Sequence, residues 1–169
     1  MTLRVVPLDK AVHDREGFSC GVPSLDDYLK RQAAQDQKRD VARAFVLLWE
    51  GETQILGYYT LSSSGIDLSD LPEAQRKKLP GYPVVPAVLL GRLAVDQSQK
   101  GKGLGAYLLM HALERCALLS QEVAVYAVIV DALDDRAAKF YEKYGFFGLP
   151  GLECRLLLPI ATIRQLLKF

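Results

Sequence analysis

The chain of 169 residues carries two different periods of apolar and polar positions. Val88–Val95 and Val123–Val130 are almost continuous apolar runs rich in β-branched residues, a pattern typical of strands that are covered on both faces. Helical spacing follows each run, over Leu104–Leu119 and over Asp134–Tyr144. The second half of the chain is therefore predicted to alternate strand, helix, strand and helix.

The first half of the chain shows shorter strand signals and one early helix. Ser24 is placed to cap that helix, and Asp26 and Asp27 are expected in its first turn. The helical spacing ends near Arg39–Asp40. The strands expected here are Leu3–Pro7, Ala44–Trp49 and Ile55–Leu61, with a turn at Gly51–Glu52 between the last two and an end at Ser62–Gly65.

The connection over Asp67–Pro86 holds four of the chain's eight prolines and shows no strand pattern. A short helix is expected within it, over Pro72–Lys78. The last elements expected are a strand from Phe146, a strand over Arg155–Pro159 and a terminal helix over Ile160–Phe169. Together the elements predict one α/β domain over residues 1–169, with a mixed, twisted sheet flanked by helices.

Composition limits the class of protein further. Half of the residues are hydrophobic and 24% are charged, which suits a full core and gives no sign of disorder. No apolar run approaches the roughly 20 residues that span a bilayer, and Met1–Pro7 lacks the apolar core of a signal peptide. We therefore expect a cytoplasmic protein. The net charge of +1 neither requires nor excludes a nucleic-acid partner.

Cysteine and histidine residues are few. Cys20, Cys116 and Cys154 are odd in number and lack the spacing of metal ligands. Since His13 and His111 are the only histidines, we expect neither a metal site nor a Cys–His nucleophile.

A glycine-rich loop, Lys100–Gly105, joins a strand to the helix that starts at Leu104. Its glycines leave backbone N–H groups uncovered, and the first helical turn adds unpaired N–H groups and partial positive charge. This combination predicts a seat for a phosphate group. The loop lacks the Gly-Lys-Ser/Thr of a Walker A sequence, and its glycine spacing differs from the dinucleotide fingerprint. Taken alone, it could also be a turn that needs glycine only for its backbone angles.

The loop and the second helix together resemble the acetyl-coenzyme A site of the GCN5-related N-acetyltransferase (GNAT) family. The family's loop is written Arg/Gln-x-x-Gly-x-Gly/Ala, which this chain matches except for Lys100 in the first place. Asp134 stands where the family often carries Asn. The resemblance covers Phe18 to about Ile160 and implies that acetyl-CoA lies in a splay between two central parallel strands. The residues implied to bind it are Leu93, Ala94, Val95, Lys100, Gly101, Lys102, Gly103, Leu104, Gly105, Ala106, Asp134, Phe140 and Tyr141.

The same resemblance implies two catalytic roles. Amine acetylation needs a stabilised oxyanion and a proton for the departing thiolate, and most of its acceleration can come from positioning. The backbone amide of Val95 is implied to bind the oxyanion, and Tyr141, with an ordinary pKa near 10, is implied to be the general acid. Tyr141 could otherwise be a core aromatic that only meets the cofactor. No general base is evident, because His111 is expected on the solvent stripe of its helix.

Further segments look like the acetyltransferase toxins of bacterial toxin–antitoxin pairs: Phe18–Leu29, Gly57–Ser62, Leu79–Pro83 and Gly91–Asp96. This resemblance implies direct acetyl transfer, through a ternary complex, to the α-amine of aminoacyl-tRNA, whose low pKa fits the missing base. It also implies a homodimer and a small DNA-binding antitoxin of the ribbon-helix-helix or helix-turn-helix type, with no membrane partner. The basic residues expected to meet tRNA phosphates, each of which could equally be a plain surface charge, are Lys30, Arg31, Lys38, Arg39, Arg43 and Arg92.

Two other functions stay open. One is an N-acetyltransferase of small amines or protein amines without a toxin role. The other is a non-catalytic module that binds acetyl-CoA or a partner, against which the presence of Tyr141 argues.

Overall fold

The computed structural model describes residues 1–168, so Phe169 of the expected terminal helix lies outside the described residues. Seven strands hydrogen-bond in the order β1-β2-β3-β4-β5-β7-β6. The β4/β5 pair is parallel, whereas the β1/β2, β2/β3, β5/β7 and β6/β7 pairs are antiparallel, so the expected mixed sheet is confirmed. The strands are β1 (Leu3–Pro7), β2 (Arg43–Trp49), β3 (Gly57–Asp67), β4 (Val84–Val95), β5 (Ala127–Asp131), β6 (Phe147–Leu149) and β7 (Leu152–Pro159).

Helices connect these strands, and their bounds agree with most of the expected ones. The α-helices are α1 (Pro23–Asp27), α2 (Ala33–Lys38), α3 (Glu73–Arg76), α4 (Leu104–Leu119), α5 (Asp135–Glu142) and α6 (Ile160–Leu167). The short helices are a π-helical turn, η1 (Tyr28–Gln32), and two 3₁₀ turns, η2 (Leu68–Asp70) and η3 (Gln97–Gln99). No helix within residues 1–168 is long and apolar enough to cross a membrane.

The chain forms two compact units. The first unit comprises Met1–Ser62 and Gly91–Ala112, and the second comprises Ser63–Leu90 and the chain from Leu113 onward. Strands β3 and β4 and helix α4 each run from one unit into the other. Each unit has its own buried cluster of apolar side chains.

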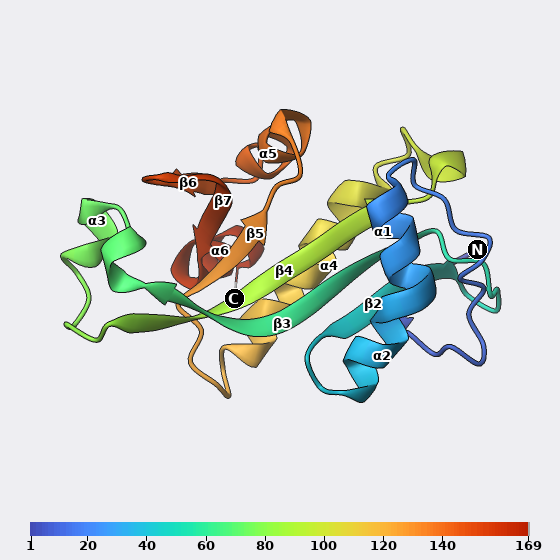
Figure 1. Ribbon diagram of the computed structural model, residues 1–169, viewed down its shortest axis with the longest axis horizontal. Helices are drawn as coiled ribbons and strands as arrows, with labels where there is room; N and C mark the ends of the chain where they lie inside the picture. Colours follow the sequence, from blue (N-terminus) through green and yellow to red (C-terminus); the bar gives the residue numbers. More distant parts are fainter. Residues whose placement is uncertain (169) are drawn as a thin grey trace. The chain divides into compact units, whose positions relative to one another are not determined.

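In the first unit, α2 packs against β2, and α1 and η1 precede α2 in the same helical segment (Figure 1). The expected cap at Ser24 is wrong: the helix begins at Pro23, and its N-cap is Val22, which makes no side-chain capping bond. Pro23 explains this start, because its fixed φ suits the first helical position. Asp26 is not free for the helix end either, since its Oδ1 accepts the N–H of Cys20 at 2.8 Å.

The turn η1 interrupts this early helix. The N–H of Ala33 donates to the C=O of Tyr28, five residues earlier, which is the hydrogen bond of a π-helix. Both Tyr28 and Leu29, which are adjacent in this turn, are buried. Sequence periodicity had predicted an uninterrupted helix here.

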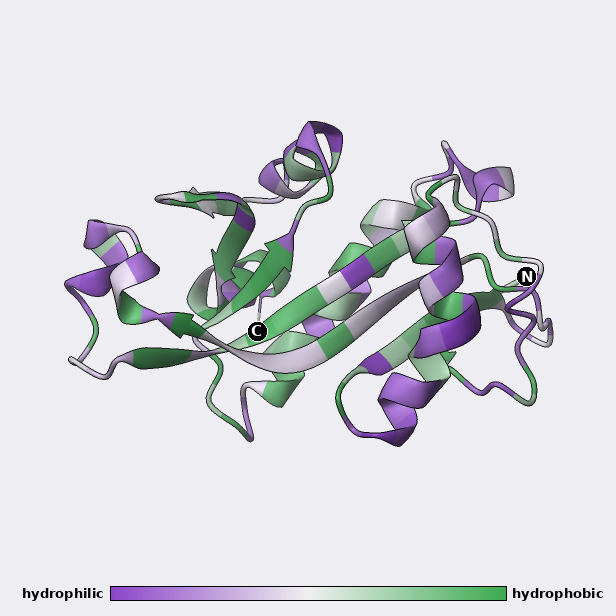
Figure 2. Ribbon diagram, viewed as in Figure 1, coloured by the Kyte–Doolittle hydropathy of each residue, from purple (hydrophilic) through white to green (hydrophobic). Residues whose placement is uncertain are grey.

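In the second unit, β5 and β7 are hydrophobic over most of their length, whereas α3 and α5 are largely polar (Figure 2). Two expected boundaries are wrong, because β3 continues through the serines to Asp67 and β4 begins at Val84, inside the connection expected to lack strands. A Cβ built on Gly65 would lie 2.6 Å from the Cγ1 of Val84, so the two strands approach closely there. Long-range pairing thus overrides the local turn signals of serine, glycine and proline.

Two other strands differ from expectation at their starts. β5 begins at Ala127 instead of Val123, because the N–H groups of Glu122 and Val123 donate back to Leu119 and leave Val123 exposed. β7 begins at Leu152, earlier than expected, after a turn at which Gly151 has φ +77°.

Candidate active site

The glycine-rich loop of the first unit leaves open backbone at the start of α4. Gly101 and Gly103 have φ values of +80° and +76°, and a Cβ at either position would meet no atom within 4 Å. The N–H of Tyr107 donates to the C=O of Gly103 at 3.1 Å, which is the first hydrogen bond of α4. The N–H groups of Leu104, Gly105 and Ala106 precede that bond and have no acceptor inside the helix. This arrangement fits a pyrophosphate, and the loop itself contributes two exposed cations, Lys100 and Lys102.

The end of β4 also presents backbone groups to one side. The N–H of Asp96 donates to the C=O of Leu56 at 2.8 Å, on the side of β3. Because backbone groups alternate along a strand, those of Leu93 and Val95 face the side opposite to β3. The register between β4 and β5 ends at Leu90, so within the described residues these groups have no strand partner.

A glycine in β3 supports this strand end. A Cβ on Gly57 would lie 2.8 Å from the carbonyl oxygen of Ala94 and 2.7 Å from the Cδ1 of Leu108. Any larger residue would therefore push β3 away from the buried Ala94 and from α4.

Asp96 fastens the loop that follows β4. Its Oδ1 accepts the N–H of Ser19 at 2.8 Å, and its Oδ2 accepts the N–H and the hydroxyl of Ser98 at 3.0 and 2.6 Å. Burial opposes ionisation, but the hydrogen bonds from Ser98 and Ser19 outweigh it and hold the pKa of Asp96 below its usual value. From the sequence, Asp96 is noted only as the last residue of the segment Gly91–Asp96 and is assigned no role, since an aspartate after a strand carries no distinctive signal by itself.

Tyr141 lies in the second unit, on α5, within a cluster of aromatic rings. Its ring meets those of Phe140 and Phe146 edge to face, at centroid distances of 5.3 and 5.4 Å. Burial raises the pKa of Tyr141 to about 12, above the ordinary value expected from the sequence. Within residues 1–168 the Tyr141 hydroxyl has no hydrogen-bond partner, so its proton is free for a ligand.

Asp134 is the N-cap of α5. Its Oδ1 accepts the N–H of Ala137 at 2.8 Å. This capping bond explains why an acidic residue is accepted at the start of the helix.

The basic residues expected to meet tRNA come from three parts of the first unit. Lys30, Arg31, Lys38 and Arg39 lie on the helical segment from η1 to α2. Arg43 lies at the start of β2, where it pairs with Asp40 at 2.8 Å. Arg92 lies on β4, with its guanidinium carbon 3.5 Å from the centroid of the ring of Tyr28, which belongs to η1.

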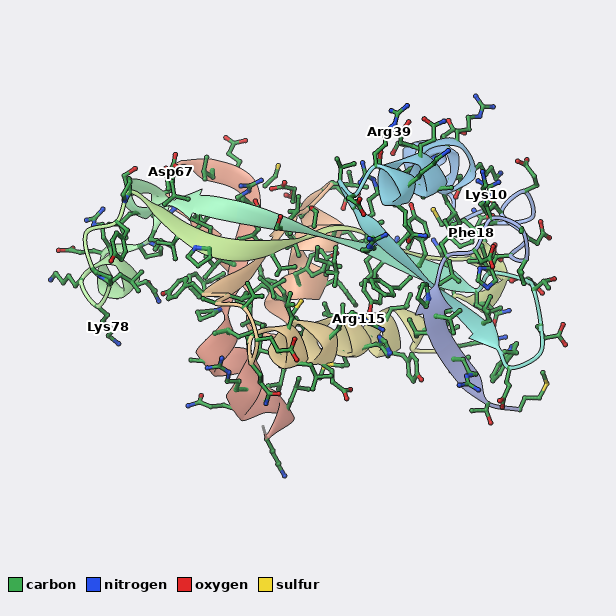
Figure 3. All side chains as sticks on the ribbon, turned by 90° about the horizontal axis from the view of Figure 1, so that it is seen from below. Lys10, Phe18, Arg39, Asp67, Lys78 and Arg115 are labelled. Carbon is green, nitrogen blue, oxygen red and sulfur yellow. The ribbon has the colours of Figure 1, made fainter. Side chains whose placement is uncertain are left out.

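One further basic residue, which was not singled out from the sequence, lies beside α2. Lys10 follows β1, and it lines a shallow depression together with Lys38 and Arg39. Lys10 and Arg39 lie in the same part of the molecule in Figure 3. The residue was missed because the fold, and not the spacing, brings the loop after β1 beside α2.

His111 differs from its expected position on the solvent stripe of α4. Its Nδ1 lies 3.0 Å from the hydroxyl of the buried Tyr59. Within residues 1–168, no group of three or more His, Cys, Asp or Glu side chains is arranged to hold a metal ion.

A profile of the acetyltransferase (GNAT) family matches residues 11–146. The chain therefore belongs to the GNAT family of acetyltransferases. It is an N-acetyltransferase with acetyl-CoA as its acetyl donor.

Two named relatives match almost the whole chain. The probable toxin TacT of Sinorhizobium fredii is 34% identical over 170 residues, covering 96% of this chain and 94% of the relative. The tRNA-acetylating toxin of Mycobacterium tuberculosis is 36% identical over 154 residues, covering 91% of this chain and 90% of the relative.

Solved structures of similar proteins include two complexes of the toxin AtaT. AtaT complexed with acetyl-methionyl-tRNAfMet is 35% identical, with a TM-score of 0.91 and coverage of 98% of this chain and 99% of AtaT. A mutant AtaT bound to the C-terminus of the antitoxin AtaR and to acetyl-CoA is 31% identical, with a TM-score of 0.85 and coverage of 99% of both chains.

Proposed function

We propose that this chain is a toxin that acetylates the α-amine of aminoacyl-tRNA and thereby blocks translation. The observation that carries the proposal is the likeness, over nearly the whole chain, to AtaT in complex with an acetylated aminoacyl-tRNA. The relatives from Sinorhizobium fredii and Mycobacterium tuberculosis are toxins by name as well. The toxin would act in the cytoplasm, where charged tRNA is found.

The glycine-rich loop and the end of β4 would hold the donor. The loop N–H groups, from Gly101 to Ala106, bind the pyrophosphate, with Lys100 and Lys102 beside it. The outward backbone groups of Leu93 and Val95 pair with the pantetheine arm, since these groups have no strand partner among residues 1–168. Ala94, between them, turns its backbone groups toward β3 and lines the arm without such a pairing. Acetyl-CoA supplies a thioester carbon that an amine can attack. The N–H of Val95 donates a hydrogen bond to the oxygen of that carbon as negative charge develops on it.

Tyr141 would supply the proton for the leaving group, with Phe140 and Asp134 beside the cofactor. As the new N–C bond forms and the C–S bond breaks, the Tyr141 hydroxyl donates its proton to the thiolate sulfur. The nitrogen gives its own proton to water, and Tyr141 is reprotonated by solvent. An α-amine next to an ester is already neutral in part near pH 7, so a base is not required. The reaction is a direct transfer with both substrates bound.

Partners follow from the same proposal. A small antitoxin with a DNA-binding domain of the ribbon-helix-helix or helix-turn-helix type would inhibit the enzyme. Two copies of the chain would form a homodimer. No metal ion takes part in these steps.

The test is transfer of labelled acetyl groups from acetyl-CoA to total charged tRNA, with uncharged tRNA as the control. We expect label on charged tRNA alone and none with Tyr141→Phe. Turnover with polyamines or peptides but not with charged tRNA would support an ordinary N-acetyltransferase and contradict the toxin. No consumption of acetyl-CoA by the pure protein would leave only a binding module.

A second variant tests the acceptor side. Replacing the four basic residues of the η1–α2 segment by Glu is expected to abolish labelling of tRNA while acetyl-CoA binding stays unchanged, because phosphate contacts position the nucleic acid. The residues replaced are Lys30, Arg31, Lys38 and Arg39. Glu at Arg76, Lys77 and Lys78, in the second unit, is the matched control and should leave labelling intact. Activity that persists in the first variant would exclude this segment as the tRNA contact.

A further inference from the structure

Arg92 lies partly buried on β4 with its guanidinium stacked on an aromatic ring. Its Cζ is 3.5 Å from the centroid of the Tyr28 ring, within the range of a cation–π interaction. Successive side chains of a strand point to opposite faces, and Ala94, two residues further on, packs in the same buried cluster as Tyr28. Arg92 therefore points to the face of β4 that is covered by η1.

Tyr28 is a fixed platform for this guanidinium. The Tyr28 ring is buried and stacks on the Tyr58 ring at a centroid distance of 6.4 Å. The Tyr28 hydroxyl donates to the Oδ2 of Asp36 at 2.8 Å, and the Gln32 amide donates to the Oδ1 of Asp36 at 2.8 Å. Both carboxylate oxygens of Asp36 thus accept hydrogen bonds. Asp36 is near enough to Arg92 for electrostatic attraction, but the two side chains form none of the ion pairs found within residues 1–168.

The donors of Arg92 are not used within the described part of the chain. Its guanidinium has no hydrogen-bond acceptor and no ion-pair partner among residues 1–168. Arg155 makes the contrast, because its Nε and Nη2 both donate to Asp131 at 2.8 Å. Stacking occupies one flat face of an arginine and leaves its five N–H donors available at the edge. An oriented, partly buried cation with free donors is suited to receive an anion.

The position of Arg92 along β4 limits which anion this can be. Arg92 precedes Val95 by three residues on one strand, which corresponds to about 10 Å. Val95 marks the place where the acceptor amine is proposed to react. The anion must therefore belong to the part of the acceptor that lies next to its amine.

In a charged tRNA the amino acid is esterified to the ribose of the terminal adenosine. The anion nearest to the α-amine is then the phosphate on the 5′ side of that nucleotide. We propose that Arg92, held by Tyr28, binds this terminal phosphate and so sets the distance between the tRNA end and the reacting amine. This inference rests on the proposed function and assigns one subsite of it.

The test compares acceptors with and without that phosphate. The probes are charged tRNA and an amide-linked 3′-aminoacyl-adenosine, prepared with and without a 5′-phosphate and carrying the amino acid whose tRNA is labelled. KM and kcat are measured for the wild type, Arg92→Gln, Arg92→Lys and the control Arg4→Gln. Arg4 lies in the same unit and pairs with Glu50, so its replacement removes a guanidinium without touching the proposed subsite. Binding of acetyl-CoA by each variant shows that the first unit is folded.

We expect Arg92→Gln to raise KM by about 10- to 100-fold for charged tRNA and for the phosphorylated analogue, as for loss of a charge-assisted hydrogen bond. The kcat and the KM for the unphosphorylated analogue should stay as in the wild type. Arg92→Lys should recover part of the loss, because it keeps the charge without the planar fork. Arg4→Gln should behave as the wild type does.

Two results would overturn the assignment. One is an unchanged KM of Arg92→Gln for charged tRNA, and the other is an equal rise for the two analogues, which would mean a structural role. If the wild type labels neither charged tRNA nor either analogue, the proposed function itself fails, and the subsite falls with it.

Discussion

The two regions expected to serve acetyl-CoA offer different chemistry. The loop of the first unit, around Gly101 and Gly103, presents backbone N–H groups and hardly any side chain. Helix α5 of the second unit presents one hydroxyl, on Tyr141, inside a cluster of rings. A backbone donor is lost only when the chain changes its path, whereas a hydroxyl is lost with one atom. Acetyl-CoA binding by the loop should therefore be lost when a substitution adds a side chain. The contribution of α5 should be lost when a substitution removes the hydroxyl.

The largest effect is expected from adding a side chain to the loop. Gly103→Asp forces an L-residue to φ +76° and places a carboxylate at the anion seat. Loss of two or more charge-assisted hydrogen bonds should weaken acetyl-CoA binding by about 100-fold or more, measured by calorimetry.

Gly81→Asp is the matched control for this change. A Cβ on Gly81 also meets no atom within 4 Å, but the residue belongs to the second unit and is not part of the loop. It should bind acetyl-CoA as the wild type does. If Gly103→Asp and Gly81→Asp bind acetyl-CoA with equal affinity, the loop is not the phosphate-binding site.

The next effect comes from removing one atom from α5. Tyr141→Phe keeps the ring contacts with Phe140 and Phe146 but lacks the proton donor. We expect kcat to fall by about 100- to 10,000-fold while the Kd for acetyl-CoA stays the same. Tyr144→Phe, whose ring meets Phe140 at 5.4 Å, is the control and should retain its turnover. If both variants turn over alike, Tyr141 is only a packing residue.

The contrast also explains what could be predicted from the sequence. The central strands, α4 and the glycine loop follow from local periodicity and from glycine spacing, because each is determined by neighbouring residues. The extensions of β3 and β4 beyond their expected bounds could not be predicted in this way. They form because Gly65 and Val84, which lie far apart in the sequence, approach each other closely in the fold. The π-helical turn also has no sequence signal, because the backbone hydrogen bond from Ala33 to Tyr28 needs no particular residue type.

The site divides in the same way. Tyr141 and the loop were found through a family motif, which records local spacing. The stack of Arg92 on Tyr28 joins residues far apart in the sequence, and so does the approach of Lys10 to Arg39. Such pairs form only when β4, η1 and the loop after β1 have folded together, so no local pattern could show them.

A smaller effect is expected from a substitution of Asp96, whose hydrogen bonds hold the chain that leads into the glycine-rich loop. Asp96→Asn keeps the size of the side chain but turns a donor toward Ser19 or Ser98, whose N–H groups the carboxylate accepts. The free energy of unfolding should fall by about 1–3 kcal/mol, as for a broken buried hydrogen bond. The Kd for acetyl-CoA should rise by about 10-fold or less, because the path of the chain toward Gly101 loosens. Denaturant unfolding and calorimetry measure the two, and an unchanged stability would mean that Asp96 is dispensable.

The smallest effect is expected from alkaline pH on kcat/KM, and it concerns the Tyr141 hydroxyl alone. A general acid must be protonated, and burial raises the pKa of Tyr141 to about 12. The value of kcat/KM should therefore rise as the acceptor amine loses its proton and then stay level, with less than about a two-fold decline by pH 10.5. With an ordinary pKa near 10, the protonated fraction would already be below half at that pH. A profile measured from pH 6 to 10.5 on an acceptor with a stable amide link distinguishes the two. A decline centred near pH 10 would mean that Tyr141 is solvated when it acts, and that the rings around it do not set its proton affinity.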